Sequence, residues 1–339
     1  MAWAARLLLL PAAVLYRAGT IARNAAYSHS LGRIVPLPAP SIGVGNLAVG
    51  GTGKTPLATW LALELSRRGV EPGIVLRGYG ADESAAYGTA LGEVPVEASP
   101  DRVAAGQAAV RRGARVLVLD DCLQHRRVWT DVMLAVVAAE TWQGPRWPLP
   151  AGPWREGRSA LRRADAVVVT RKSAASGHAD EVASALGPLT ATGEAIRADL
   201  ALAGLRPLAG GAVEPPGGLG GQDVLAVSGI GEPEAFAAQL VSLGARVRPM
   251  PFGDHHPYTP ADVTRIIQAA GTHGRIVTTA KDAVKLAPLW PKKGPRCDVA
   301  MLGVTIAAGA HVMDRLVDRV VGLARHPNPV SADAPPMRA

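Results

Sequence analysis

The 339-residue sequence has only two cysteines, Cys122 and Cys297, and few aromatic residues. Two cysteines can form neither a multi-disulfide framework nor a four-cysteine zinc site. Aromatic residues make up 4% of the chain, and it has no lysine-rich tail. Because nucleic-acid sites combine basic segments with aromatic stacking, we expect no nucleic-acid partner.

Long apolar runs are also missing. The N-terminal run Leu7–Tyr16 is short and contains Pro11, whereas a helix that spans a bilayer needs about 20 apolar residues. Hydrophobic residues nevertheless make up 48% of the chain and charged residues 19%, which excludes wholesale disorder. The length predicts two domains or one large one. A net charge of +8 favours an anionic partner, such as a nucleotide or a phospholipid surface.

A glycine-rich segment near the N-terminus has the pattern of a phosphate-binding loop. A buried strand is expected over Ser41–Asn46 and an apolar-periodic helix over Leu57–Leu65. Strand, glycine loop and helix in this order are the context that a P-loop requires, although Ala48 stands where the usual pattern has glycine. The expected nucleotide-binding residues are Gly50, Gly51, Thr52, Gly53, Lys54 and Thr55. Lys54 is expected on the β- and γ-phosphates and the Thr55 hydroxyl on Mg²⁺.

A second apolar strand, Arg115–Leu119, ends in Asp120 and Asp121. In P-loop enzymes an acid at the end of such a strand holds the metal. Two adjacent carboxylates can serve Mg²⁺ and either a metal-bound water or a nearby cation, so both are candidate metal residues. His125, close to both acids, is a further candidate for a role beside phosphate or metal.

The first residues predict a cationic amphipathic helix. Apolar residues recur at spacings of three and four over Trp3, Leu7, Leu10, Val14, Ala18 and Ile21. Arginines at positions 6, 17 and 23 flank this face. The pattern favours a helix lying on a membrane surface. The alternative is a helix packed on its own domain.

Strands that alternate with helices predict a mostly parallel α/β sheet of the P-loop NTPase type, with helices on both faces. A smaller second α/β domain is expected after a segment rich in glycine and proline. We therefore predict an N-terminal membrane-associating segment 1–34, a P-loop kinase core 35–205, a joint 206–222, a smaller C-terminal domain 223–325 and a disordered tail 326–339.

Eight motifs occur in an order that resembles one enzyme family. They are VGNLAVGGTGKTP, LRGYG, DDCLQHRR, LPAGPWRE, RRADAVVVTR, GIGEPEAF, FGDHHPYT and TTAKDAVKL. Together they cover roughly residues 8–290 and strongly resemble tetraacyldisaccharide 4′-kinase, the lipid A kinase of Gram-negative bacteria. The resemblance implies an enzyme that uses ATP and Mg²⁺ to phosphorylate the 4′-hydroxyl of tetraacyldisaccharide 1-phosphate. It also implies a peripheral or monotopic location on the cytoplasmic face of the inner membrane.

The resemblance assigns roles to individual residues. Lys54 matches the phosphate-binding lysine and Asp120 a magnesium acid, and both are expected to be catalytic. Glu156 matches an acid that follows the Pro-Ala-Gly-Pro turn. His255, beside Asp254, resembles the histidine that is paired with an acidic catalytic base.

The acidic base is where this chain departs from the family pattern. The family has Gly-Asp-Glu-Pro, and the nearest match here is Gly92-Glu93-Val94-Pro95. Glu93 is therefore the expected base, since a carboxylate one methylene longer can still accept a proton. Asp82 is the rival candidate, and a third possibility is that the chain has no equivalent residue.

Two other functions remain open from the sequence. A P-loop NTPase that drives a partner, such as a metallochaperone-like protein, would explain the P-loop and the Asp pair. An inactive relative at a membrane surface would explain the unusual Glu93 region. The first leaves the Asp254-His255 motif unexplained, and the intact Lys54 and acidic pair argue against the second.

Overall fold

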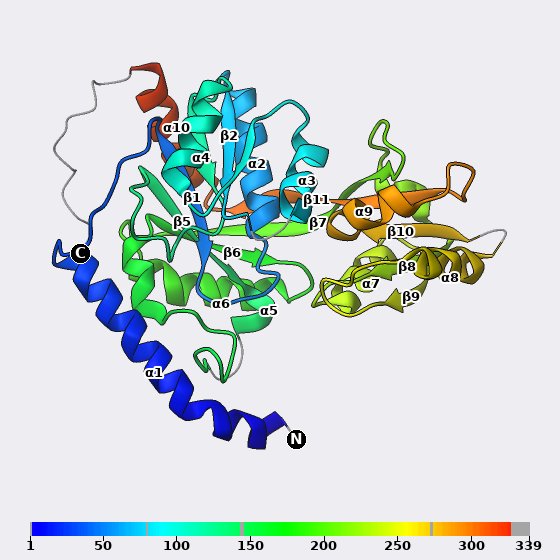
Figure 1. Cartoon of the computed structure of the whole chain (residues 1–339), viewed down its shortest axis with the longest axis horizontal. Helices are drawn as coiled ribbons and strands as arrows, with labels where there is room; N and C mark the ends of the chain where they lie inside the picture. Colours follow the sequence, from blue (N-terminus) through cyan, green and yellow to red (C-terminus); the bar gives the residue numbers. More distant parts are fainter. Residues whose placement is uncertain (1, 79–80, 143–145, 272–273, 327–339) are drawn as a thin grey trace. The chain divides into compact units, whose positions relative to one another are not determined.

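The computed structural model describes residues 2–78, 81–142, 146–271 and 274–326, and it divides into two compact units. The larger unit comprises residues 1–78, 93–199 and 306–339, and the smaller unit comprises residues 79–92 and 200–305. The chain therefore passes between the units four times. Figure 1 labels the elements of both units.

The larger unit is built on parallel strands in the order β3-β2-β4-β1-β5-β6-β7. Their bounds are β1 Ser41–Asn46, β2 Pro72–Leu76, β3 Val96–Ala98, β4 Val116–Leu119, β5 Val132–Ala138, β6 Ala166–Arg171 and β7 Ala195–Pro207. Every residue of β1, β2 and β4 is buried. Because successive residues of a strand face opposite sides, the sheet is covered on both faces there, as predicted.

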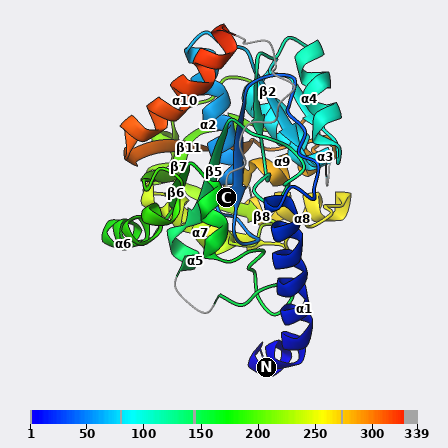
Figure 2. The same cartoon turned by 90° about the vertical axis from the view of Figure 1, so that its left-hand side faces the viewer.

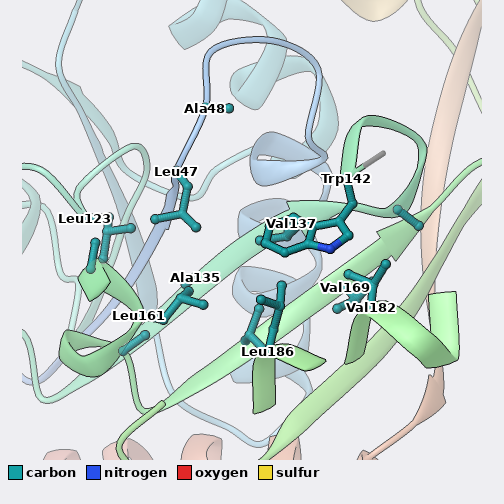
Figure 3. Close-up of a cluster of buried hydrophobic side chains, with 14 of the residues drawn as sticks. Leu47, Ala48, Leu123, Ala135, Val137, Trp142, Leu161, Val169, Val182 and Leu186 are labelled. Atoms are coloured by element: carbon teal, nitrogen blue, oxygen red, sulfur yellow. The ribbon is translucent and has the colours of Figure 1, made fainter. Parts of the chain in front are cut away.

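Helices flank these strands, as Figure 1 shows. They are α2 Lys54–Arg67, α4 Arg102–Arg111, α5 Ala139–Trp142, α6 Ser176–Leu186 and α10 Ala310–Arg325, with the short 3₁₀ helices η1 Arg158–Arg163 and η2 Gly187–Leu189. Figure 3 shows one core cluster, in which Val137 and Trp142 lie near Leu47 and Ala48, the residues that lead into the glycine loop. The loop thus starts from a packed apolar base.

The smaller unit has its own parallel strands in the order β11-β10-β8-β9. These are β8 Asp223–Ser228, β9 Arg246–Pro251, β10 Arg275–Thr279 and β11 Cys297–Ala308. Its helices are α3 Ala81–Leu91, α7 Pro233–Ser242, α8 Pro260–Ala270 and α9 Ala280–Leu286, with η3 Pro216–Leu219 and η4 Ala287–Leu289. The predicted second α/β unit is therefore present, and α3 packs against α9 within it.

The segment 206–222 does not form a joint. Leu205 and Glu214 exchange two backbone hydrogen bonds of 2.9 and 2.7 Å, which tie this segment to the end of β7 inside the smaller unit. The long strands β7 and β11 instead continue from one unit into the other. The glycine and proline content predicted a boundary between domains here. Backbone hydrogen bonds to β7 instead hold the segment within the smaller unit.

The C-terminal helix also differs from the prediction, because α10 folds with the larger unit. Its apolar face is buried, and Arg68, the residue that follows α2, forms ion pairs with Asp314 and Asp318 of α10. Arg115 donates to the Ala324 carbonyl at 2.9 Å. Of the tail predicted as disordered, residues 327–339 lie outside the described part of the chain.

The N-terminal helix α1 runs over Ala2–Ser28 and is drawn in dark blue in Figure 2. Leu7, Val14 and Ile21, from the predicted apolar face, are 62%, 64% and 59% exposed. Leu8 and Leu15 are more exposed still, so the exposed apolar surface is wider than the predicted stripe. Among the described residues, no helix combines the length and apolar character that a membrane span requires.

Glu64 of α2 accepts a hydrogen bond from Arg68, the residue that pairs with α10. The pKa of Glu64 predicts how the stability of the protein depends on pH. Hydrogen bonds from Arg67 and Arg68 outweigh the effect of burial and lower the pKa of Glu64 to about 2. A lowered pKa adds stability above the unfolded-state value near 4.5, and that stability is lost as the pH falls toward 2.

We therefore expect Glu64→Gln to reduce the free energy of unfolding by about 1 kcal/mol at pH 7. The difference from the wild type should shrink progressively as urea unfolding is repeated from pH 5 down to pH 2. The exposed Glu71→Gln is the control and should differ little at any pH. A Glu64→Gln deficit that stays constant across this range would contradict the assignment.

Candidate functional site

The glycine loop adopts the backbone conformation that only glycine accepts easily. Gly50 and Gly53 have φ values of 116° and 88°, in the left-handed region. Gly53 is the N-cap of α2 and makes no side-chain capping bond. The helix dipole favours negative charge at this N-terminus of α2.

Neighbouring elements hold the loop in place. The Asn46 side chain donates to the Thr52 hydroxyl at 3.0 Å and to the Ala48 carbonyl. The hydroxyl of Thr170, on β6, donates to the Thr52 carbonyl at 2.8 Å. Lys172, just after β6, donates to the Gly51 carbonyl at 2.7 Å. These bonds fix the position of the loop.

The segment Pro153–Glu156 folds back on the strand-to-loop connection. The Val49 N–H donates to the Pro153 carbonyl and the Arg155 N–H to the Leu47 carbonyl, both at 2.8 Å. This pairing explains why the Pro-Ala-Gly-Pro-Trp-Arg-Glu run lies beside a phosphate-binding loop that is about a hundred residues earlier in the chain. It brings the side chain of Arg155 to the acidic pair.

The structure brings together Lys54, Thr55 and both acids. Thr55 donates to Asp120 Oδ2 at 3.2 Å, and Lys54 Nζ lies 3.7 Å from Asp121 Oδ1. Arg155 Nη1 lies 2.7 and 2.8 Å from the two oxygens of Asp121. Asp121 therefore pairs with two cations, while Thr55 and Asp120 face each other at the start of α2.

The charge state of Asp121 follows from these partners. Burial opposes ionisation, but the neighbouring Lys54 and the hydrogen bond from Arg155 outweigh it and lower the pKa of Asp121. Asp121 also has a φ of 53°, an uncommon conformation for a residue other than glycine. A strained residue with a fully ionised carboxylate is typical of a functional site.

Thr55 and Asp120 suit magnesium. Mg²⁺ takes one or two carboxylates, and nucleotide phosphates and water complete its octahedron. The described residues contain no group of three or more His, Cys, Asp or Glu side chains that could hold a metal by itself. A hydroxyl and a carboxylate at the phosphate loop are the donor set of a metal that arrives with its nucleotide.

Sequence reasoning missed Arg102, the first residue of α4. Its side chain is 1% exposed, and it donates to the Asp120 carbonyl at 3.0 Å. Burial lowers the pKa of this guanidinium. Nothing in the local sequence marks Arg102 as a partner of Asp120, because the two residues are 18 positions apart in the chain.

His125 and Glu156, the further candidates from the sequence, have different surroundings. His125 is half-buried, and burial followed by the nearby Arg102 lowers its pKa, so the imidazole is neutral at pH 7. Glu156 is buried and accepts hydrogen bonds from Asn24 of α1 at 2.6 Å and from Arg163 at 2.8 Å. Through Asn24, Glu156 attaches α1 to the rest of the larger unit.

In the smaller unit, a chain of hydrogen bonds leads to His255. The His255 N–H donates to the Gly229 carbonyl at 3.0 Å, and His255 has a φ of 58°. The Gly229 N–H in turn donates to Asp282 Oδ2 at 3.0 Å, and the Thr279 hydroxyl donates to the same oxygen at 2.6 Å. Asp282 is 1% exposed, whereas Asp254 and His255 are exposed.

Only glycine fits at position 229. A Cβ there would lie 2.9 Å from Asp282 Oδ1 and 3.2 Å from the Gly253 carbonyl. His256 is occupied locally, with Nε2 3.1 Å from Asp262 Oδ2 and its ring against Phe252 and Tyr258. Of the two adjacent histidines, His255 is therefore the one that presents an exposed side chain.

The two candidate bases fall in different elements. Glu93 is exposed and lies in a turn between α3 and β3, within the larger unit. Asp82 lies in the first turn of α3, in the smaller unit that also contains His255. The side chain of Asp82 lies outside the described part of the structure.

Four features together define a P-loop nucleotide-binding protein. They are the parallel sheet, the glycine loop, the N-terminus of α2 and the two acids that follow β4. The family model described as tetraacyldisaccharide-1-P 4′-kinase (LpxK) matches residues 5–89 and 82–321. The chain therefore belongs to the tetraacyldisaccharide 4′-kinase family.

Curated relatives and a solved structure agree with this assignment. A tetraacyldisaccharide 4′-kinase of Aromatoleum aromaticum is 39% identical over 83% of this chain and 84% of that protein. One of Alkalilimnicola ehrlichii is 38% identical over 84% of this chain and 85% of its own. The crystal structure of LpxK from Aquifex aeolicus in complex with ATP matches with a TM-score of 0.73 and 26% identity, over 93% and 99% of the two chains.

The hydrogen bonds that link Asp282 through Gly229 to His255 predict that a change at Asp282 affects His255. In Asp282→Asn, an amide replaces the carboxylate that accepts from Gly229 and Thr279, so we expect a loss of about 1–3 kcal/mol in unfolding free energy. The His255 ring resonances in a proton–carbon NMR spectrum should also shift.

Asp298→Asn is the matched control, because Asp298 is equally buried in the same unit and pairs with Arg275 and Arg296 instead. It should destabilise the unit without moving the His255 resonances. Equal effects of both variants on His255 would show that Asp282 acts only through general stability.

Proposed function

We propose that this chain transfers the γ-phosphoryl group of ATP to the 4′-hydroxyl of tetraacyldisaccharide 1-phosphate, a step of lipid A biosynthesis. The observation that carries the proposal is the convergence of Lys54, Thr55, Asp120 and Asp121 at a preformed glycine loop. The family to which the chain belongs supplies the acceptor. Phosphoryl transfer needs mainly positioning and compensation of charge, which this cluster provides.

Each residue has a defined task in this proposal. The loop amides and Lys54 bind the β- and γ-phosphate oxygens, and Arg155 adds positive charge at the same place. Thr55 and Asp120 would hold Mg²⁺, which supplies charge neutralisation on the phosphates when it is bound. Asp121 keeps Lys54 and Arg155 oriented through its two ion pairs.

We assign the acidic base to Asp82 with His255, in place of Glu93. Asp82 and His255 belong to the same compact unit, where α3 packs on α9 and Asp282 of α9 holds Gly229, the partner of His255. Glu93 lies in an exposed turn of the other unit.

The exposed apolar surface of α1 supports a location at the cytoplasmic face of the bacterial inner membrane. Leu8 and Leu15 are 83% and 75% exposed, and the helix carries Arg6, Arg17 and Arg23 but no acidic residue. A helix of this composition binds an anionic bilayer surface through apolar burial and charge. It would place the enzyme where its acylated acceptor resides.

A direct transfer assay tests the proposed reaction. The protein in neutral detergent receives Mg-ATP and tetraacyldisaccharide 1-phosphate, and mass spectrometry of the lipid should show a gain of one phosphate. Lys54→Ala should lower the rate at least about 100-fold with little loss of stability, because it removes a charge aimed at the reacting phosphates. The exposed Lys292→Ala should retain the wild-type rate. ATP consumption without lipid phosphorylation would favour an NTPase that drives a partner.

The base assignment has its own test. Asp82→Asn should lower kcat by about 100- to 10,000-fold, the range for loss of a general base, and Glu93→Gln should leave kcat within about twofold. Both are measured with saturating Mg-ATP after thermal unfolding has shown that the variants are folded. The opposite ranking would return the role to Glu93.

A further inference from the structure

Glu140, in the short helix α5, holds the segment that follows β6 by its backbone amides. One carboxylate oxygen, Oε1, accepts three consecutive N–H groups. They belong to Lys172, Ser173 and Ala174, at 2.6, 2.9 and 3.1 Å. Successive N–H groups that converge in this way form a concave place for an anion, and here the protein's own carboxylate occupies it.

The contact is strong, and a second side chain reinforces it. Burial opposes ionisation, but hydrogen bonds from the backbone amides of this segment outweigh burial and lower the pKa of Glu140. Arg171 donates to the Ala174 carbonyl at 3.4 Å and to the two oxygens of Asp199 at 2.8 and 2.5 Å. The backbone from 171 to 174 is therefore held from both α5 and β7.

This segment directs the Lys172 side chain to the glycine loop. Lys172 Nζ donates to the Gly51 carbonyl at 2.7 Å, two residues after the buried Thr170, whose hydroxyl donates to the Thr52 carbonyl at 2.8 Å. Lys172 is only half-buried, so its ammonium group does not need this contact for solvation. The consequence of the contact therefore falls on the loop.

Two held carbonyls restrict the peptide units of the loop. Because a peptide unit is planar and trans, its N–H points away from its C=O. Holding the Thr52 carbonyl therefore directs the Gly53 N–H away from β6. Gly50 and Gly53 have positive φ values, and glycine lets neighbouring peptide units rotate at little cost. Such a loop needs outside partners to keep one arrangement, and a preorganised arrangement binds its ligand more tightly.

We propose that Lys172 and Glu140 are positioning residues for the nucleotide. Glu140 orders the segment after β6, Lys172 holds the Gly51 carbonyl, and the glycine loop thereby keeps the conformation that binds phosphates. The inference rests on the nucleotide-binding part of the proposed function and is independent of the acceptor. Because Lys172 holds the loop backbone and not a reacting atom, its loss should weaken nucleotide binding and leave the chemical step unchanged.

The experiment measures Mg-ADP binding to the full chain by isothermal titration calorimetry, in neutral detergent and without a lipid acceptor. Lys172→Met should raise Kd about tenfold, the scale of one charge-assisted hydrogen bond. In the transfer assay it should raise KM for ATP by a similar factor and keep kcat within about twofold at saturating ATP. Lys172→Arg keeps a cationic donor and should stay within about threefold of the wild-type Kd.

Glu140→Gln tests whether the effect passes through the backbone. A neutral amide oxygen accepts the three N–H groups more weakly, so Kd should rise about three- to fivefold although no positive charge is lost. The double variant with Lys172→Met should bind no more weakly than Lys172→Met alone, because both changes act along one path.

The matched controls remove the same charges elsewhere in the larger unit. Arg162→Met removes an exposed positive charge from η1, and Glu181→Gln removes an exposed negative charge from α6. Both controls should bind Mg-ADP as the wild type does.

Three outcomes would overturn the proposal. If Lys172→Met weakened binding and Glu140→Gln did not, Lys172 would act on the nucleotide directly. If Arg162→Met weakened binding as much as Lys172→Met, the effect would be a general attraction of anions. If kcat fell in parallel with the free energy of unfolding in urea, both residues would serve the fold alone. A wild type that bound no Mg-ADP would instead contradict the nucleotide-binding part of the proposed function.

Discussion

The paired charge of Asp121 is the interaction on which the rest of the larger unit depends. A partly buried carboxylate is costly unless cations accompany it, and Lys54 and Arg155 do so from two distant parts of the chain. Lys54 comes from the start of α2, and Arg155 from the segment that folds back on the glycine loop. Three segments must therefore fold together before this charge is compensated, and their meeting point is the phosphate site.

The turn after β4 can approach β1 closely because β1 has glycine at positions 43 and 45. A Cβ on Gly45 would lie 2.4 Å from the backbone nitrogen of Leu123, and one on Gly43 would lie 2.5 Å from the Cys122 sulfur. The Cys122 N–H donates to the Val44 carbonyl at 3.0 Å between them. The turn that carries both acids thus lies directly against β1, within reach of the loop that follows this strand.

The segment Pro153–Glu156 combines several tasks in four residues. Its backbone braces the entry to the glycine loop, Arg155 compensates Asp121, and Glu156 attaches α1. The glycine loop, the orientation of Asp121 and the position of α1 are thus coupled through one short stretch. In the smaller unit, Asp282 has a comparable part, because one buried carboxylate orients the backbone on which His255 stands.

The motifs that carry local chemistry were predictable from the sequence alone. The glycine loop, Lys54, Thr55 and the acids after an apolar strand follow from backbone rules and spacing, and the strand Ser41–Asn46 follows from a short apolar run. The family followed from the order of eight motifs. Four features were decided only in the tertiary structure. They are the partners of Asp121, the burial of Arg102, the link from Asp282 to His255 and the placement of α10. Each of these depends on residues far apart in the chain, and no local pattern specifies which of many arginines or aspartates will meet.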